Sequence, residues 1–485
     1  MNDIFHSTVT ELKALLDAKE VSSVDLVRGF LSRMEAHADL NAYLDIRPEV
    51  SLSQAKKADE ARARGTAAPF CGVPVAFKDI FVTKDFTSTA ASKMLKGYMS
   101  PFDATVVRKL YEAGMVCLGK LNCDEYAMGG ANENSAYGKV LNPWNKGHVP
   151  GGSSGGSAAS VAAGLTPIAT ATDTGGSIRL PASFCGVTGI KPTYGRPSRL
   201  GMIPFACSLD TAGLIAHDAR DCAAVLSVMT GFDEKDSTSV EMPAEDFTRD
   251  LGKPVAGMKI GVPRKWYSGK IDPELTRRIE DAVTEFKKQG ADIREIDLPN
   301  AHLGVPVYYV VACAEASSNL GRYDGVRYGH RASSYTDIHD MMRKSRTEAF
   351  GAEAKRRILI GTYVLSHGYY DAYYIKAQQV RRLIADDFKR VFQDIDMILM
   401  PTTTGPAYAF GEKAAPVDAY LEDLFNTPIS LAGLPSVALP CGTHTNGLPL
   451  GFQLVGPEFS EARLLQAADA YQRETSWHKL YAPGF

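Results

Sequence analysis

The 485-residue sequence contains no long hydrophobic run. No stretch of about 18 consecutive apolar residues occurs, so no membrane-spanning helix is expected. The chain opens with polar residues and has no signal-like apolar segment, and none of its eight cysteines is paired in a C-x-x-C spacing. These absences predict a protein of the reducing cytoplasm, with no membrane contact and no disulfide framework.

Metal-ligand motifs and a surplus of positive charge are also missing. The sequence has neither an H-E-x-x-H motif nor a close His/Cys cluster, so we expect no catalytic metal. The formal net charge is −3, which lacks the electrostatic signature of a nucleic-acid-binding chain. With 45% hydrophobic residues, the chain can nevertheless bury a large core.

What the sequence does contain is two serine-bearing glycine runs, at residues 151–157 and 172–177. Glycine permits unusual backbone angles and lets several backbone N–H groups crowd one ligand atom. Such donors can stabilise the oxyanion that forms when a serine attacks a carbonyl, and removing one donor costs about 3 to 4 kcal/mol. The runs therefore indicate acyl transfer by a serine.

Other interpretations of these runs fit less well. A phosphate-binding loop would need a Gly-Lys-Ser/Thr ending that neither run has. A flexible linker is opposed by the helix-forming residues 158–165 and the strand-like residues 167–172. Residues 151–155 match the Gly-x-Ser-x-Gly nucleophile elbow, but that motif follows a buried strand, and residues 142–150 are typical of a loop. The ten histidines are scattered and suggest no base.

Lys78 is the best candidate for the base. It lies in the apolar segment Gly72–Ile80, which is typical of a buried strand ending at the polar pair Lys78 and Asp79. An exposed lysine is protonated at neutral pH, and lowering its pKa by three units takes about 4 kcal/mol of desolvation or charge repulsion. Burial among Val and Phe would supply this, whereas a side chain that reaches solvent from the strand end would not. The sequence leaves both possibilities open.

At these residues the chain resembles the amidase signature family, through GVPVAFKDI at 72–80 and the block from Val149 to Thr193. The resemblance implies a Ser-Ser-Lys triad in which Lys78 is the base, Ser153 the bridging serine and Ser177 the nucleophile. It further implies a cis peptide bond at the bridging serine. The backbone N–H groups of Thr174, Gly175, Gly176 and Ser177 would form the oxyanion hole.

Further segments narrow the resemblance to members of the family that hydrolyse glutamine for tRNA-dependent amidation, among them residues 121–129, 133–138, 368–374 and 426–435. In such members Ser177 would attack the glutamine side-chain amide, release ammonia and form an acyl-enzyme that water converts to glutamate. The ammonia would pass to a partner that amidates misacylated Glu-tRNA(Gln), Asp-tRNA(Asn) or both. Two partners, the B and C subunits, are implied. ATP and magnesium are expected on a partner, no cofactor on this chain, and tRNA mainly on the partners.

The resemblance also implies a recognition site for free glutamine. Arg357 would bind the α-carboxylate and Asp423 the α-ammonium, because charge-assisted pairs are strong and geometrically selective. Tyr308 is a further candidate for this pocket. Arg356 is adjacent to Arg357 and could take its place, and either arginine could instead be an exposed helix residue. Relatives often carry serine at Gly130 and Ala131, so no side-chain contact is predicted there.

Three functions fit these motifs. The first is a glutamine-hydrolysing subunit that supplies ammonia for tRNA-dependent amidation. The second is a stand-alone amidase acting on small amides, which keeps the triad and needs neither Arg357, Asp423 nor a partner. The third is a catalytically silent scaffold, against which the intact Lys78, Ser153 and Ser177 speak.

The element pattern predicts an α/β fold: a single large domain, residues 1–485, with a central twisted mixed sheet covered by helices on both faces. Within it we expect a helical N-terminal segment (1–65), a catalytic core (66–230) and the remaining strands with the recognition elements (254–485). Residues 22–25 resemble a capping box that opens a helix ending near Ala36. The polar residues 234–253 could be a domain linker or a surface excursion, and the resemblance favours the excursion. Other predicted elements are helices at 55–64, 272–289 and 374–392, and strands at 115–119, 186–191, 258–262, 293–298 and from 428 to 457.

Overall fold

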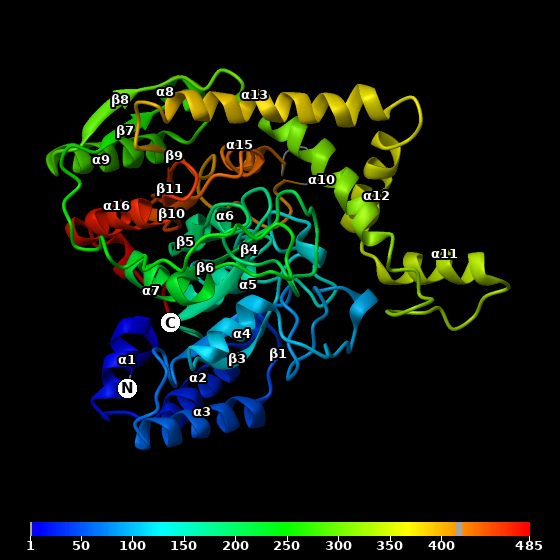
Figure 1. Ribbon diagram of the computed structural model, residues 1–485, viewed down its shortest axis with the longest axis horizontal. Helices are drawn as coiled ribbons and strands as arrows, with labels where there is room; N and C mark the ends of the chain where they lie inside the picture. Colours follow the sequence, from blue (N-terminus) through cyan, green and yellow to red (C-terminus); the bar gives the residue numbers. More distant parts are fainter. Residues whose placement is uncertain (1, 414–419) are drawn as a thin grey trace.

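An eleven-stranded mixed sheet runs through the computed structural model, which describes residues 2–413 and 420–485 (Figure 1). Strand β2 is parallel to β3 and β4, β7 is parallel to β8 and β9, and the other neighbours are antiparallel. In spatial order the strands are β1 (Tyr43–Asp45), β3 (Val116–Leu121), β2 (Pro74–Lys78), β4 (Ile168–Asp173), β6 (Thr211–Ala216), β5 (Thr188–Lys191), β10 (Ser436–Thr443), β11 (Pro449–Val455), β9 (Met397–Pro401), β7 (Lys259–Val262) and β8 (Asp292–Glu295).

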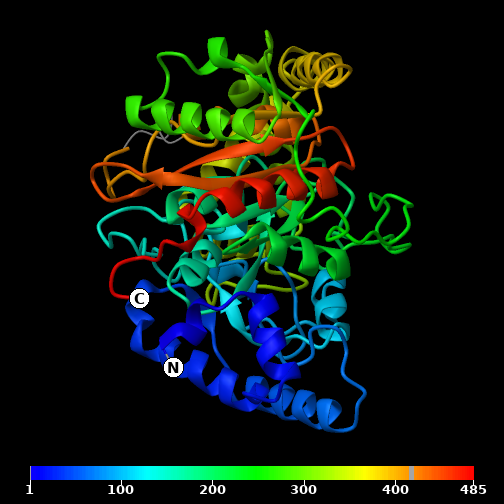
Figure 2. The ribbon, with the colours of Figure 1, turned by 90° about the vertical axis from the view of Figure 1, so that its left-hand side faces the viewer.

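Helices cover both faces of this sheet, as the two perpendicular views show (Figures 1 and 2). Helices α5 and α6 pack on one side, and α7, α9 and α16 form a layer on the other. The α-helices are α1 (Val9–Asp17), α2 (Ser23–Ala36), α3 (Pro48–Ala63), α4 (Thr105–Glu112), α5 (Gly155–Ala162), α6 (Arg179–Cys185), α7 (Ala219–Met229), α8 (Arg264–Tyr267), α9 (Pro273–Lys288), α10 (Gly304–Leu320), α11 (Ile338–Ala349), α12 (Ala352–Val364), α13 (Lys376–Val391), α15 (Thr427–Leu431) and α16 (Glu461–Glu474). The predicted fold class is confirmed.

The middle strands of the sheet are completely buried. Every residue of β2, β3 and β4 is buried, which is typical of strands covered on both faces. A polar side chain placed here is separated from water by the helix layers, so its hydrogen bonds must come from the protein. Lys78 ends the central strand β2 and meets this condition.

An arm of helices extends from the sheet on the side that carries α10. We define the arm as residues 338–376: helices α11 and α12 and a π-helical turn, η6 (Asp371–Ile375). Helix α12 lies very close to α10, because a Cβ added at Gly361 would fall 1.9 Å from the carbonyl oxygen of Cys313. The face of α12 toward α10 therefore belongs to the core, and its opposite face points outward.

Several elements differ in extent from the predicted ones. Helix α3 begins at Pro48 rather than Ala55, since proline is favoured in the first turn of a helix. Of the capping box predicted at Ser22 the serine half is present: its hydroxyl accepts the N–H of Asp25 at 3.0 Å and donates to the carboxylate of Asp25 at 2.6 Å. The prediction of strands throughout 428–457 is wrong at its start: residues 427–431 form α15, with a proline in its first turn.

Residues 234–253 connect α7 to β7, a strand of the same sheet, and these described residues hold no helix or strand. They are an excursion from one continuous sheet rather than a linker between two. The division into segments 1–65, 66–230 and 254–485 stays a prediction.

All eight cysteines are free, and none of the helices in the described ranges is both long and apolar enough to cross a membrane.

Candidate active site

Lys78 is fully buried at the end of β2, and its amine contacts only hydroxyl groups among the described residues. Its Nζ lies 2.8 Å from Ser153 Oγ, 2.9 Å from Ser154 Oγ and 2.7 Å from Thr172 Oγ1. Desolvation lowers the pKa of Lys78 to about 8, because burial outweighs the nearby charges of Asp124, Asp173 and Asp210, which favour the ammonium form. The structure thus excludes a lysine that reaches solvent from the strand end.

The hydroxyls around Lys78 have distinct roles. Ser154 donates its proton to the carbonyl of Thr172 at 3.2 Å, so it accepts a hydrogen bond from the amine. A neutral amine has two N–H donors and one lone pair. With the donors directed at Ser154 and Thr172, the lone pair is free to accept the proton of Ser153. The arrangement therefore suits proton transfer between Ser153 and Lys78.

A buried carboxylate shapes the loop that carries Ser153. The peptide bond between Gly152 and Ser153 is cis, as the family resemblance implies. A Cβ added at Gly152 would fall 2.2 Å from Asp124 Oδ2, so only glycine fits there. Asp124 accepts the N–H groups of Asn132 and Asn134, each at 3.0 Å, and its own N–H donates to the carbonyl of Ser153 at 3.2 Å. The sequence alone did not indicate this function for Asp124.

Ser177 lies between β4 and α6, buried at 7% exposure. The N–H of Ser154 donates to the carbonyl of Ser177 at 3.3 Å, which ties the two glycine runs together. In the described part of the chain no hydrogen bond joins the hydroxyl of Ser177 to that of Ser153. The structure thus joins Lys78 to Ser153 and brings Ser177 to the same loops. Catalytic hydrogen bonds often tighten only when substrate is bound.

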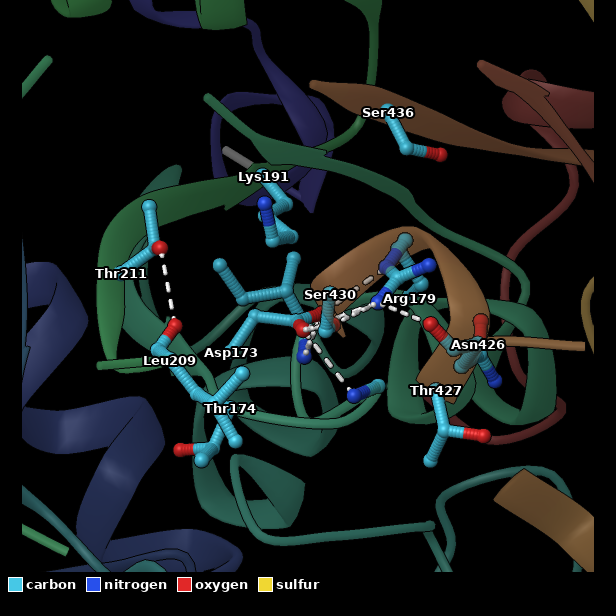
Figure 3. Close-up of polar contacts among 12 residues, drawn as sticks. Asp173, Thr174, Arg179, Lys191, Leu209, Thr211, Asn426, Thr427, Ser430 and Ser436 are labelled. Atoms are coloured by element: carbon cyan, nitrogen blue, oxygen red, sulfur yellow. Dashed lines mark hydrogen bonds and ion pairs between the residues drawn. The ribbon is translucent and has the colours of Figure 1, made fainter. Parts of the chain in front are cut away.

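The loop before Ser177 is held by a buried ion pair between Asp173 and Arg179 (Figure 3). Arg179 donates to both oxygens of Asp173, at 2.9 and 3.0 Å. The same carboxylate accepts the N–H groups of Gly176 at 2.9 Å and Ile178 at 3.1 Å. Burial alone would raise the pKa of Asp173, but the charge of Arg179 and these hydrogen bonds lower it overall. The pair was not predicted, although Asp173 lies within the second glycine run and Arg179 follows it by two residues.

This pair decides which of the predicted oxyanion donors are available. The N–H of Gly176 is directed at Asp173 and is not free. Those of Thr174, Gly175 and Ser177 have no acceptor among the residues that the structure describes. The side chain of Thr174 donates to Asp210 at 2.6 Å, and burial raises the pKa of that carboxyl to about 6. Three of the four predicted donors are therefore not engaged by another described residue, and their role as an oxyanion hole stays a prediction.

Arg357 and Asp423 are brought together by a tyrosine. Arg357 is 3% exposed, and its Nε donates to Glu353 at 2.8 Å. Its guanidinium lies over the ring of Tyr309 at 5.2 Å, and the hydroxyl of Tyr309 donates to Asp423 at 2.9 Å. Desolvation raises the pKa of Asp423 to about 7. Nothing in the local sequence distinguished Tyr309 from its neighbour.

The neighbouring candidates lie in different places. Arg356 is 43% exposed and pairs with Glu353 from outside, so Arg357 is the buried member of the two. Tyr308 is buried against the second glycine run: a Cβ added at Gly175 would fall 2.5 Å from its ring. Tyr308 thus packs against the predicted oxyanion loop. Within the described ranges, no group of three His, Cys, Asp or Glu residues could hold a metal ion.

The chain belongs to the amidase family, because the Amidase family model matches residues 25–465. The chain is 56% identical to the A subunit of glutamyl-tRNA(Gln) amidotransferase from Cupriavidus taiwanensis, over 97% of each protein. It is 55% identical to the protein of the same name in Burkholderia pseudomallei, over 97% of this chain and 98% of that one.

Solved structures show the same fold. The A subunit of glutamyl-tRNA(Gln) amidotransferase from Thermotoga maritima is 37% identical with a TM-score of 0.81, over 97% of this chain and 96% of that chain. Native peptide amidase of Stenotrophomonas maltophilia is 31% identical with a TM-score of 0.82, over 97% of each chain.

Proposed function

We propose that this chain is the glutamine-hydrolysing subunit of an amidotransferase that converts misacylated Glu-tRNA(Gln), Asp-tRNA(Asn) or both to the correctly amidated tRNA. It would assemble with B and C subunits. A partner would bind ATP and magnesium and contact most of the tRNA. The names of the relatives support the assignment. The observation that carries it is the buried amine of Lys78, which is hydrogen-bonded to Ser153 and whose lowered pKa favours the neutral form.

In the proposed reaction, Ser177 Oγ attacks the side-chain carbonyl carbon of glutamine. Its proton passes to Ser153, whose own proton passes to Lys78. The free N–H groups of Thr174, Gly175 and Ser177 stabilise the oxyanion. The ammonium of Lys78 then returns its proton through Ser153 to the leaving nitrogen, and ammonia departs. Water, deprotonated by the same route, releases glutamate from the acyl-enzyme.

The choice of glutamine as substrate rests on Arg357 and Asp423. Only the Nε of the buried Arg357 is hydrogen-bonded to another described residue, so its terminal nitrogens can bind the α-carboxylate. Asp423 can pair with the α-ammonium, and the bound cation would favour the charged carboxylate. Tyr309 and Glu353 position these two groups. Simple aliphatic amides offer neither charge.

Ammonia release from glutamine tests the proposal. We expect the purified chain to hydrolyse glutamine slowly, and much faster when it is co-expressed with B and C subunits. Rapid hydrolysis of simple aliphatic amides by the chain alone, with glutamine ignored, would instead establish a stand-alone amidase. The Ser177→Ala variant should form no acyl-enzyme detectable by mass spectrometry while still assembling with the partners. Full activity in that variant would exclude Ser177 as the nucleophile.

A further inference from the structure

The outer side of the arm exposes a set of large hydrophobic side chains, which we call the tyrosine face. Leu359 is 70% exposed and Tyr363 is 48% exposed, one turn apart on the same side of α12. Tyr369, Tyr370 and Tyr373 follow in and beside the π-helical turn η6, each 40–42% exposed. None of the residues of η6 is buried. Single exposed hydrophobic residues are normal, but a contiguous group indicates an interaction site.

The tyrosine rings pack on one another rather than into the core. The ring centres of Tyr363 and Tyr369 are 4.4 Å apart, and Tyr373 lies 6.0 Å from both. Tyr370 stacks on Tyr374 at 5.3 Å. Rings fixed in this way lose little freedom on binding, which is one reason why tyrosine is enriched in protein interfaces. The face is thus ordered before any partner arrives.

A hollow adjoins the tyrosine face. It measures about 280 Å³ and lies between α10, the end of α12 and η6, where Leu365 and Tyr374 form part of its wall. Tyr374 also stacks on Tyr370, so the wall of the hollow is in contact with the face. A hollow beside an aromatic patch can receive an anchoring side chain, the usual centre of a tight interface.

The charge of the arm indicates the character of the partner. Residues 338–376 carry seven Lys and Arg against four Asp and Glu, whereas the whole chain has a formal charge of −3. Lys376, next to η6, is exposed and has no ion-pair partner among the described residues. Arg356 lies on the same side of α12 as Leu359 and Tyr363. A surface with an apolar centre and acidic edges would complement this arrangement.

We propose that the tyrosine face is the docking surface for a partner protein subunit with acidic residues around an apolar contact. The inference rests on the proposed function, because the relatives are named as subunits of an amidotransferase. RNA is the less suitable occupant, since the most exposed member is the aliphatic Leu359, which offers a nucleotide neither stacking nor charge. The opposite side of α12 carries Arg357, which is proposed to bind the α-carboxylate of glutamine. Docking would therefore also fix the helix that positions Arg357.

The test compares Tyr363→Glu with Phe232→Glu in the full-length chain. The two wild-type side chains are matched in exposure, 48% and 47%, but Phe232 follows α7 and does not belong to the arm. Each variant is titrated with co-expressed B and C subunits, and the dissociation constant is measured by light scattering and biolayer interferometry. Tyr363→Glu should weaken assembly roughly thirtyfold or more, and Phe232→Glu less than threefold. The melting temperature of each free chain checks folding.

A second variant probes the charge. Lys376→Glu should slow association and reduce its dependence on salt, with little change in the dissociation rate. Unchanged assembly in both Tyr363→Glu and Lys376→Glu would overturn the docking surface and leave the proposed function standing, because assembly itself would have been observed. No assembly of the wild-type chain would overturn both.

Two other outcomes would also overturn the proposal. If Tyr363→Glu left assembly intact but weakened binding of tRNA to the complex, the face would be an RNA-binding surface. If the free chain were a dimer that Tyr363→Glu dissociates, the face would bind a second copy. Docking that orders α12 would be supported by one further result. In the presence of the partners, the KM of Tyr363→Glu for glutamine should exceed that of the wild type, while the KM of the free chain should be the same with and without the substitution.

Discussion

The loops at residues 124–179 and the arm at residues 338–376 depart from the usual distribution of side chains in opposite directions. The loops bury charge: Lys78 beside them, Asp124, Asp173 and Arg179 are all 0% exposed. The arm exposes tyrosine and leucine to solvent. Most proteins hide apolar groups and expose charged ones, so each departure needs a compensating interaction. In the loops this is a nearly complete set of internal hydrogen bonds, and on the arm it is, by our proposal, another subunit.

The two regions should therefore respond differently to mutation. Buried charges have no alternative partners, so single changes in the loops are expected to be severe. Exposed side chains on the arm have water as an alternative in the free chain, so changes there should matter mainly in the assembly. Substitutions in each region can break or sharpen this contrast.

The largest effect is expected for Lys78→Ala. Without the amine, Ser153 has no base to take its proton, and members of one catalytic unit fail together. The turnover number for glutamine should fall by about 10⁴-fold or more, measured as ammonia release. Lys191→Met is the matched control: Lys191 is equally buried, desolvation lowers its pKa to about 7, and its amine bonds carbonyls instead of hydroxyls. Comparable loss in the control would contradict the assignment.

Asp173→Asn should lower the free energy of unfolding more than the other substitutions. Breaking a buried pair leaves the charge of Arg179 uncompensated, at a cost of about 3 to 5 kcal/mol. Urea unfolding of the free chain measures it. The control is Asp386→Asn on α13, where the partner Arg382 is 72% exposed and the cost should stay below about 1 kcal/mol. Equal costs would remove the contrast between the loops and the helices near the arm.

Arg357→Lys should raise the KM for glutamine with a smaller change in turnover. Lysine keeps the charge but loses the planar fork that binds a carboxylate through two hydrogen bonds. An increase of about 30- to 100-fold corresponds to the loss of one such charged contact, about 2 to 3 kcal/mol. Arg356→Lys, one residue away and 43% exposed, should leave the KM within about twofold. The reverse result would assign the carboxylate to Arg356.

The activity should rise with pH. Catalysis needs Lys78 neutral, with a pKa of about 8, and recognition needs Asp423 charged, with a pKa of about 7. Lowering the pH protonates both groups, so kcat/KM should fall below pH 8 and more steeply below pH 7. At saturating glutamine the α-ammonium of the bound substrate keeps Asp423 charged. The profile of kcat against pH should therefore show only the step near pH 8, which is that of Lys78. A kcat that is constant from pH 6 to 9 would contradict a lysine base.

The smallest effect is expected for Tyr363→Ala in the free chain. Its ring packs on Tyr369 and Tyr373, which are themselves exposed, so the free energy of unfolding should change by less than about 0.5 kcal/mol. Thermal melting measures it. A large destabilisation would show that the tyrosine face stabilises the chain itself and is not kept for a partner.

Many of the active-site residues were predictable from the sequence. Lys78, Ser153 and Ser177 lie in local motifs that resemble a known family, and their roles stay predictions, while the structure places Lys78 and Ser153 in contact. The capped start of α2 and the alternation of helices and strands were also visible, because caps and periodicity depend on neighbouring residues. Element boundaries such as those of α3 and α15 were not.

The groups that hold these motifs in place could not be predicted. Arg179 bonds Gln453, which is 274 residues away, and Arg357 meets Asp423 only through Tyr309. A local sequence pattern does not indicate such contacts between residues far apart in the chain.

The sequence alone determined which residues can react and where most helices and strands lie, since these properties follow from side-chain chemistry and near-neighbour geometry. Only the tertiary structure decided that the amine of Lys78 is desolvated, that Gly176 gives its N–H to Asp173, and that Arg357 rather than Arg356 is buried. Desolvation and hydrogen-bond partners depend on what distant segments bring to the same place, and folding alone settles that.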